Sequence, residues 1–277
     1  MTNPNWSDKD TVECRSIVSQ WVAMRAIENN PSGLDEIHRD ICSRFVELGF
    51  KVNLDENTSA PHRPLICATR ESNPDGPWLG FWGHYDVEPA VETDWSTSPW
   101  DLEEVDSRWV GRGVGDNLVP LAQRIIIFGK MDPKVNIVYY LQGEEEIGSP
   151  FAESQYGSIT VPPVDLWVEE TGYFYKDGRQ RLMVLNENEL LKEILTELQS
   201  ILHQDGREWT IRHRPLNKAF GAENCPCLKH LLGEIPYIAI GPNDDHCTVH
   251  GIDESVSPNL LPICADQLHK VVEVMVS

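Results

Sequence analysis

The chain has 277 residues, and its 23 Lys and Arg residues against 44 Asp and Glu residues give a formal net charge of −21 at pH 7. This charge argues against proteins that bind nucleic acid or an anionic membrane surface, because both partners require positive charge. The compact apolar runs, such as residues 125–128, are far too short to cross a bilayer. We therefore expect one large or two small domains, with no nucleic acid and no membrane as partner.

The beginning of the sequence and the cysteines bear on the compartment. Residues 1–10 have neither a basic end nor an apolar core of the kind that signal peptides carry. Seven cysteines, an odd number, do not follow the spacing of a small disulfide-bonded protein. These features predict a reduced, cytoplasmic protein.

Apolar periodicity predicts alternating helices and strands along the chain. The stripe from Leu34 to Leu48 indicates a helix that stops at Gly49. In chain order we expect helices at 10–27 and 34–48, strands at 63–70 and 77–87, a hairpin at 101–113, a helix at 120–130, strands at 135–146 and 165–170, a helix at 189–206, strands at 208–214 and 236–242, and a helix at 259–275. Continuous apolar strands between helices predict an α/β fold with a mostly parallel central sheet and helices on both faces.

Three of these strands end in side chains that can bind metal ions. They run into residues 83–86, 143–146 and 168–170, and the loops 111–117 and 244–254 add further His, Asp and Glu residues. A single histidine after a strand is more often a surface residue, and a glutamate run is more often a solvated face. Five such clusters at strand ends and adjoining loops favour a metal site, since carboxylates and imidazoles bind divalent ions such as Zn²⁺.

Two ions sharing a carboxylate activate water for attack on an amide carbonyl, and a further carboxylate must move the proton to the leaving nitrogen. His84 and Asp86 fit such a centre, because positions i and i+2 of an extended segment face the same side.

Residues 78–150 resemble the di-zinc family of aminoacylases, carboxypeptidase G, succinyl-diaminopimelate desuccinylases and carnosinase-type dipeptidases. The resemblance lies in "GHYDVEP", "DWSTSPWDLEEVDSRWVGRGVGDN" and "GEEEIGS", in this order and spacing. It implies a zinc-exopeptidase-like catalytic domain that holds two divalent metal ions, namely Zn²⁺ with Mn²⁺ or Co²⁺ as alternatives. The substrate would be a small amide or peptide.

The resemblance also implies a role for each motif residue. His84 would bind the first metal ion, Asp86 would orient the His84 ring, and Asp116 would bridge both ions. A cis peptide bond is expected after Asp116. Glu145 would be the general base and Glu146 a ligand of the second ion.

Two ligands have a rival nearby in the sequence. The resemblance selects Glu170 for the first metal ion, with Glu169 as the rival, and strand alternation lets only one of them face the metals. It selects His250 for the second ion, with His246 as the rival.

Between the positions of Glu170 and His250, the family normally inserts a lid domain, for which this chain has too few residues. We expect a single catalytic domain, 1–277, with a short 172–188 connection in place of the lid. The lid usually carries the dimer interface and the groups that hold the oxyanion. A monomer or a dimer through another surface is therefore expected, with an oxyanion donor from His246, from 172–188 or from another chain.

Three functions follow from these observations. The first is hydrolysis of an amide bond in a dipeptide, an N-acyl amino acid or a related small amide. The second is a tailoring amidohydrolase of a specialised pathway, acting on a bulky or carrier-bound intermediate, with a carrier protein as partner. The third is an inactive metal-binding interaction protein, which Asp86 and Glu145 disfavour because such a protein needs no proton shuttle.

Overall fold

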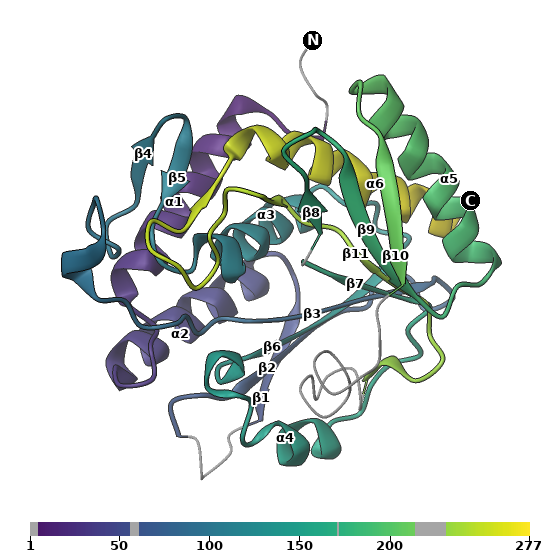
Figure 1. Cartoon of the computed structure of the whole chain (residues 1–277). Helices are drawn as coiled ribbons and strands as arrows, with labels where there is room; N and C mark the ends of the chain where they lie inside the picture. Colours follow the sequence, from purple (N-terminus) through teal and green to yellow (C-terminus); the bar gives the residue numbers. More distant parts are fainter. Residues whose placement is uncertain (1–4, 56–60, 171, 214–230) are drawn as a thin grey trace.

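The structure is a computed structural model of the chain, and it describes residues 5–55, 61–170, 172–213 and 231–277. A large mixed sheet runs through the molecule, and helices lie on both of its faces (Figure 1). Its strands are β1 (Lys51–Asp55), β2 (Leu65–Arg70), β3 (Trp78–His84), β6 (Asn136–Gln142), β7 (Leu166–Glu169), β8 (Tyr173–Phe174), β9 (Gln180–Leu185), β10 (Trp209–His213), β11 (Tyr237–Ala239) and β12 (Asn243–Asp244).

The centre of this sheet is parallel and its flanks are largely antiparallel. The strand order is β1-β2-β6-β3-β7-β11-β9-β8-β12, with β10 paired to β9. Strands β6, β3, β7 and β11 pair in parallel, whereas β1 with β2, β2 with β6, β9 with β11 and β8 with β9 pair antiparallel. The predicted α/β fold with helices on both faces is confirmed, and the sheet is mixed, with parallel pairing at its centre and antiparallel pairs on its flanks.

A second, three-stranded sheet stands beside the large one. It joins the hairpin β4 (Glu103–Val105) and β5 (Arg108–Val110), which lies within the predicted hairpin at 101–113, to β13 (Ser255–Val256). Strand β13 pairs antiparallel with β5. This small sheet therefore connects the loop that leads to Asp116 with the loop that carries His250.

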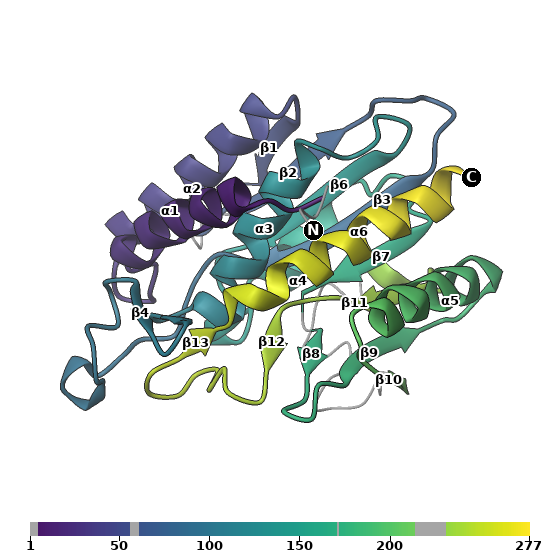
Figure 2. The same ribbon diagram turned by 90° about the horizontal axis from the view of Figure 1, so that it is seen from above.

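In the described part of the chain, five helices contribute to the larger core on one face of the large sheet, and the view from above shows helices ranged over this face (Figure 2). They are α1 (Asp8–Met24), α2 (Pro31–Glu47), α3 (Val119–Phe128), α5 (Glu189–Gln204) and α6 (Leu261–Val276). The short helix α4 (Ala152–Ser158) lies on the opposite face. No helix in the described ranges is long and apolar enough to cross a membrane.

The local sequence explains where the first two helices begin. Ser7 and Asp10 form a capping box at the start of α1, in which each side chain accepts a hydrogen bond from the other residue's backbone N–H. Asn30 caps α2, and Pro31 occupies its first turn, where proline is favoured. The predicted apolar stripe of α2 from Leu34 to Phe45 is buried against the sheet.

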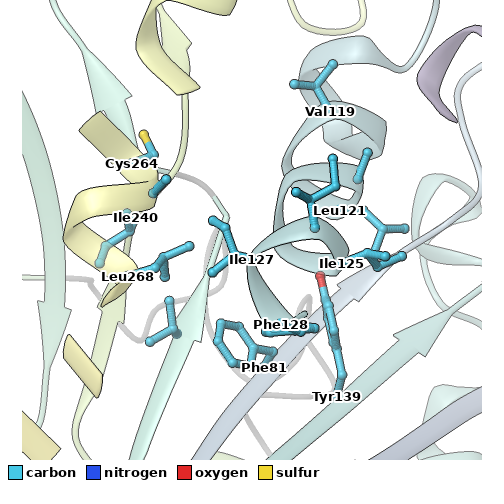
Figure 3. Close-up of a cluster of buried hydrophobic side chains, with 14 of the residues drawn as sticks. Phe81, Val119, Leu121, Ile125, Ile127, Phe128, Tyr139, Ile240, Cys264 and Leu268 are labelled. Carbon is cyan, nitrogen blue, oxygen red and sulfur yellow. The ribbon is translucent and has the colours of Figure 1, made fainter. Parts of the chain in front are cut away.

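Alternate residues of the central strands pack into two separate cores. Phe81 faces the larger core, where its ring lies 5.0 Å from that of Phe128 and 5.5 Å from that of Tyr139 (Figure 3). The next residue, Trp82, faces the opposite core and stacks on Tyr237 at 5.3 Å. The strands that lead to the predicted site are thus fixed on both faces.

The segment 172–188, predicted to be a short connection, contributes two strands to the large sheet. Strand β8 pairs with β9, and β9 in turn pairs with β10 and β11. Gln180 of β9 is fully buried on the face of the sheet that α6 covers. Its side chain exchanges hydrogen bonds with the side chain of Gln267 of α6. The described residues 172–213 are therefore built into the same sheet as the predicted site.

Candidate metal centre

Three parallel strands bring their carboxyl ends to one edge of the sheet. Strand β3 ends at His84, β6 leads into Glu145 and Glu146, and β7 leads into Glu170. Sites in α/β proteins commonly form at this edge, where strands open into loops.

Asp116 lies between two histidines. It belongs to the irregular segment Val114–Leu118 before α3, and its bond to Asn117 is cis, as the resemblance implied. One carboxylate oxygen, Oδ1, lies 2.9 Å from Nε2 of His84. The other, Oδ2, lies 3.3 Å from Nε2 of His250. A carboxylate that turns one oxygen toward each histidine has the geometry of a bridge between two sites.

Glu146 joins this arrangement through His250, since its Oε2 lies 3.0 Å from Nε2 of His250. Two sets of three residues bring potential ligand atoms within 4.8 Å of one another, namely His84 with Asp116 and Glu146, and Glu88 with Glu146 and His250. Four of the five predicted ligands thus occur in these sets.

Glu170, the fifth predicted ligand, lies beside the two sets. Its Oε1 accepts a hydrogen bond of 2.6 Å from the Asn117 side chain. Its Oε2 is buried and has no hydrogen-bond partner among the described residues. The carboxylate packs against Gly83, where an added Cβ would lie 3.2 Å from Glu170 Oε1, so Glu170 reaches the backbone beside His84.

Glu169 points to the other face of the sheet. Its Oε2 accepts a hydrogen bond of 2.8 Å from the hydroxyl of Tyr237, in the core that also contains Trp82. Between these two carboxylates, Glu170 is the one that contacts Asn117, the residue after Asp116.

Asp86 connects the ends of β3 and β6. Its carboxylate accepts hydrogen bonds from the backbone N–H of Glu145 at 3.2 Å and of Glu146 at 3.1 Å. The sequence predicted that this carboxylate would take the second ring nitrogen of His84. Nδ1 of His84 lies 3.4 Å from it but only 3.0 Å from the backbone oxygen of Asp86, so the carbonyl makes the shorter contact.

Glu254, to which the sequence assigned no role, holds the loop before Asp116. Its carboxylate accepts hydrogen bonds from the backbone N–H of Gly113 at 2.9 Å, Gly115 at 2.8 Å and Asp116 at 3.2 Å. Arg112 donates to the same carboxylate at 2.8 Å. Glu254 thereby fixes Asp116 relative to the loop of His250, and no local pattern indicates this role because the partners lie about 140 positions apart.

Contacts with carboxylates dominate the protonation of the two histidines. Burial lowers the pKa of His84, but hydrogen bonds with Asp116 and Asp86 outweigh it and raise that pKa well above its usual value. Hydrogen bonds with Asp116 and Glu146 raise the pKa of His250 to about 10. Burial acts to raise the pKa of Asp116, but its contacts with both histidines outweigh this and hold it below the usual value.

The glutamates of the cluster respond in the opposite direction. Burial raises the pKa of Glu146 to about 7 and that of Glu170 to about 7. Glu145 reaches the surface, yet the protein atoms around its carboxylate still raise its pKa, and the charges of Asp116 and Asp86 add to this effect. Within the described ranges no Lys or Arg forms an ion pair with these three glutamates. The cluster therefore has a deficit of positive charge.

His246 does not join the cluster in the structure. It is exposed, its backbone N–H donates to Asp244 at 2.9 Å, and it belongs to neither of the two sets. Its predicted role in holding the oxyanion stays a prediction.

The residues present fit a pair of divalent ions. Imidazole and carboxylate ligands suit Zn²⁺ and Mn²⁺. Asp116 turns its two oxygens toward two histidines, and the unpartnered oxygen of Glu170 is a buried acceptor with capacity for a cation.

No family model matches the chain. Among curated proteins, β-Ala-His dipeptidase of Homo sapiens is 38% identical over 151 residues, which are 48% of this chain and 30% of that protein. The Cys-Gly metallodipeptidase of Saccharomyces cerevisiae is 37% identical over 115 residues, 38% of this chain and 24% of the yeast protein. The matched regions thus span less than a third of either relative.

Among solved structures, the M20 family metallo-carboxypeptidase Sso-CP2 from Sulfolobus solfataricus superposes with a TM-score of 0.72. The match covers 95% of this chain and 99% of that chain, at 13% sequence identity. At this identity the likeness concerns the fold, and it extends over almost the whole chain.

Proposed function

We propose that this chain is a member of the M20 family of metallopeptidases and dipeptidases, and that it hydrolyses an amide bond in a dipeptide, an N-acyl amino acid or a related small amide with the help of two divalent metal ions. The observation that carries this proposal is the position of Asp116, whose two oxygens face His84 at 2.9 Å and His250 at 3.3 Å. The names of the relatives suggest β-Ala-His and Cys-Gly as the first substrates to test.

In this proposal His84 and Glu170 hold the first ion, Glu146 and His250 hold the second, and Asp116 is shared. Zn²⁺ is the proposed metal, with Mn²⁺ or Co²⁺ as alternatives. When bound, the ions would polarise the substrate carbonyl and lower the pKa of a water molecule. The ions would also supply the positive charge that the carboxylates of this edge lack among the described residues.

Glu145 is the proposed general base. It follows β6 directly, and Asp86 fixes its backbone N–H at 3.2 Å. Because its side chain is exposed, it can reach a substrate that enters from solvent. Its raised pKa suits a group that accepts a proton and then delivers it to the leaving nitrogen.

We further propose that the chain works as a single catalytic domain with the β8–β9 segment where relatives insert a lid. The described residues 172–213 support this, since they pair within the large sheet. The half-exposed side chain of His250 leaves the site open, which favours bulky or carrier-bound amides as a second class of substrate.

His246 is the proposed oxyanion donor, because it is exposed and lies four residues before His250 on the same loop. An oxyanion donor is worth about 10²–10³ in rate. His246→Ala should therefore lower kcat by that factor without loss of metal. If His246→Ala kept the full kcat, another group would be the oxyanion donor.

The proposed function is tested with the whole purified chain. Activity would be assayed against β-Ala-His, Cys-Gly and several N-acetyl amino acids before and after treatment with a chelator, and again after addition of Zn²⁺, Mn²⁺ or Co²⁺. We expect loss of activity on metal removal and recovery on addition. Undiminished hydrolysis after exhaustive metal removal would contradict the proposal.

A further inference from the structure

We propose that Glu88 is an additional carboxylate ligand of the second metal position, next to Glu146 and His250; this inference rests on the proposed function. Its potential ligand atom lies within 4.8 Å of those of Glu146 and His250. Glu88 lies within the motif "GHYDVEP", but neither the roles that the resemblance implies nor the predicted ligand set includes it.

The backbone around Glu88 is held in place on both sides. The N–H of Tyr85 donates to the carbonyl of Gln142 at 2.9 Å, and the N–H of Val87 donates to the carbonyl of Ala26 at 3.0 Å. The side chains of Tyr85 and Val87 are buried in the larger core. These contacts leave Glu88 little freedom to move away from the site.

Alternation along this segment directs Glu88 to the same edge as His84 and Asp86. In an extended chain, residues i, i+2 and i+4 face one side. His84 contacts Asp116 and Asp86 contacts the N–H groups of Glu145 and Glu146, so this side is the site. Glu88 is the next residue in the alternation, and it belongs to a set with Glu146 and His250.

The carboxylate of Glu88 has capacity for a ligand. It is half-buried, and among the described residues no hydrogen bond or ion pair engages it. The Glu146 side chain beside it is only 4% exposed and pairs with His250. A partly buried carboxylate beside another carboxylate is unfavourable without a cation between them.

Glu88 would change the character of the second position. With Asp116, Glu146 and Glu88, three carboxylates and the imidazole of His250 would surround that ion, whereas His84, Asp116 and Glu170 would hold the first. Oxygen-rich sites favour Mn²⁺ over metals that prefer nitrogen and sulfur ligands. We therefore expect the second position to accept Mn²⁺ readily and to depend on Glu88 for its affinity.

The test is titration of the metal-free, full-length chain with Mn²⁺ alone, followed by calorimetry. The wild type should bind two ions. Glu88→Gln should weaken one of them about 10–100-fold, the range typical for loss of a residue that supports a metal, and should leave the other unchanged. Glu88→Asp, which keeps the charge but shortens the reach, should also be weakened.

Glu92→Gln is the matched control, because Glu92 lies on the same loop, is exposed and pairs with Arg25 at 3.2 Å outside both sets. It should bind Mn²⁺ like the wild type. Thermal unfolding of metal-free Glu88→Gln should occur at no lower temperature than that of the metal-free wild type, which shows that the loss of affinity is not one of folding.

The outcomes separate this inference from the proposed function. If the wild type bound two ions and Glu88→Gln bound them with unchanged affinity, only the role of Glu88 would be wrong. If Glu88→Asp regained full affinity, the effect of Glu88 would be one of charge and direct ligation would be wrong. If the wild type bound no Mn²⁺, Zn²⁺ or Co²⁺, the proposed function would fail together with this inference.

Discussion

Two neighbouring regions of this molecule differ in how the negative charge of their carboxylates is compensated. In the first, on and beside the small sheet, arginines neutralise them: Arg112 lies 2.8 Å from Glu254, and Arg108 makes two contacts with Asp244 at 2.8 and 2.9 Å. We call this the arginine-paired region. In the second, the carboxylate cluster of Asp116, Glu145, Glu146 and Glu170, no described arginine or lysine forms an ion pair.

This difference in charge compensation separates a structural role from a cation-binding role. A buried charge is tolerated when a partner compensates it, and an arginine fork is a permanent partner. Among the described residues, the cationic partners of the carboxylate cluster are two histidines, so further compensation must come from beyond the described residues or from protons. The arginine-paired region therefore stabilises the loops, whereas the carboxylate cluster has the charge needed for cations.

The largest expected effect is on catalysis, in the carboxylate cluster. Glu145→Gln should lower turnover by about 10²–10⁴, because general-base help is worth that much. Metal content should stay close to that of the wild type, and so should the free energy of unfolding. Turnover of any substrate cleaved by the wild type is the measurement. If Glu145→Gln lost metal while Glu146→Gln kept it, the roles of the two residues would be exchanged.

The next effect is on stability, in the arginine-paired region. Glu254→Ala should lower the free energy of unfolding by about 3–5 kcal/mol, because it leaves Arg112 buried without its partner and three N–H groups without an acceptor. Denaturant unfolding of the metal-free protein measures this. A loss of less than about 1 kcal/mol in the free energy of unfolding would show that the stability of the arginine-paired region does not depend on the Arg112–Glu254 pair.

Glu170→Gln should have a smaller effect on the free energy of unfolding of the metal-free protein, and near neutral pH it should raise this free energy rather than lower it. Burial raises the pKa of Glu170 to about 7, from an ordinary value of 4.5. The ionised form is thus disfavoured in the folded state, and stability falls as pH rises from about 4.5 through 7. The raised pKa of His250, about 10, extends this fall to higher pH.

Glu170→Gln removes the part of this pH-dependent loss of stability that comes from Glu170, and it keeps a side chain of the same shape. The variant should lose less stability than the wild type between pH 5 and 8, as followed by thermal unfolding without metal. A steeper loss in the variant would mean that Glu170 is compensated within the chain after all.

The smallest effect is expected for an arginine pair at the surface. Glu92→Gln breaks the ion pair with Arg25. The side chain of Glu92 is 55% exposed and that of Arg25 is 47% exposed. Its cost should be no more than about 1 kcal/mol, because water screens such pairs. Denaturant unfolding checks this value, and a larger loss would show that pairing matters irrespective of burial.

The sequence predicted the parts whose chemistry is local. The stripe of α2 and the alternation of His84 with Asp86 depend on neighbours a few positions away. The stripe is buried as expected, and the Asp86 carboxylate lies 3.4 Å from Nδ1 of His84, although the Asp86 carbonyl is closer. Alternation also separates Glu169 from Glu170: Tyr237 donates to the carboxylate of Glu169, and Asn117 donates to that of Glu170. The same alternation extends to Glu88, which lies two positions after Asp86 and belongs to a set with Glu146 and His250.

Other features depend on partners far along the chain. Strand β9 was not predicted, because the side chain of its buried Gln180 finds its hydrogen-bond partner in Gln267 of α6, far along the chain. The role of Glu254 depends on backbone groups near Gly113 and Asp116. The antiparallel flanks of the sheet likewise follow from pairing, which apolar runs alone do not specify.

The most direct test of the account is the metal content of the purified chain, measured by mass spectrometry after saturation with Zn²⁺ and removal of free metal. The wild type should retain two ions per chain, and Asp116→Ala should retain at most one, since this residue faces both His84 and His250. A wild type that retains none, or an Asp116→Ala variant that retains two, would contradict the account.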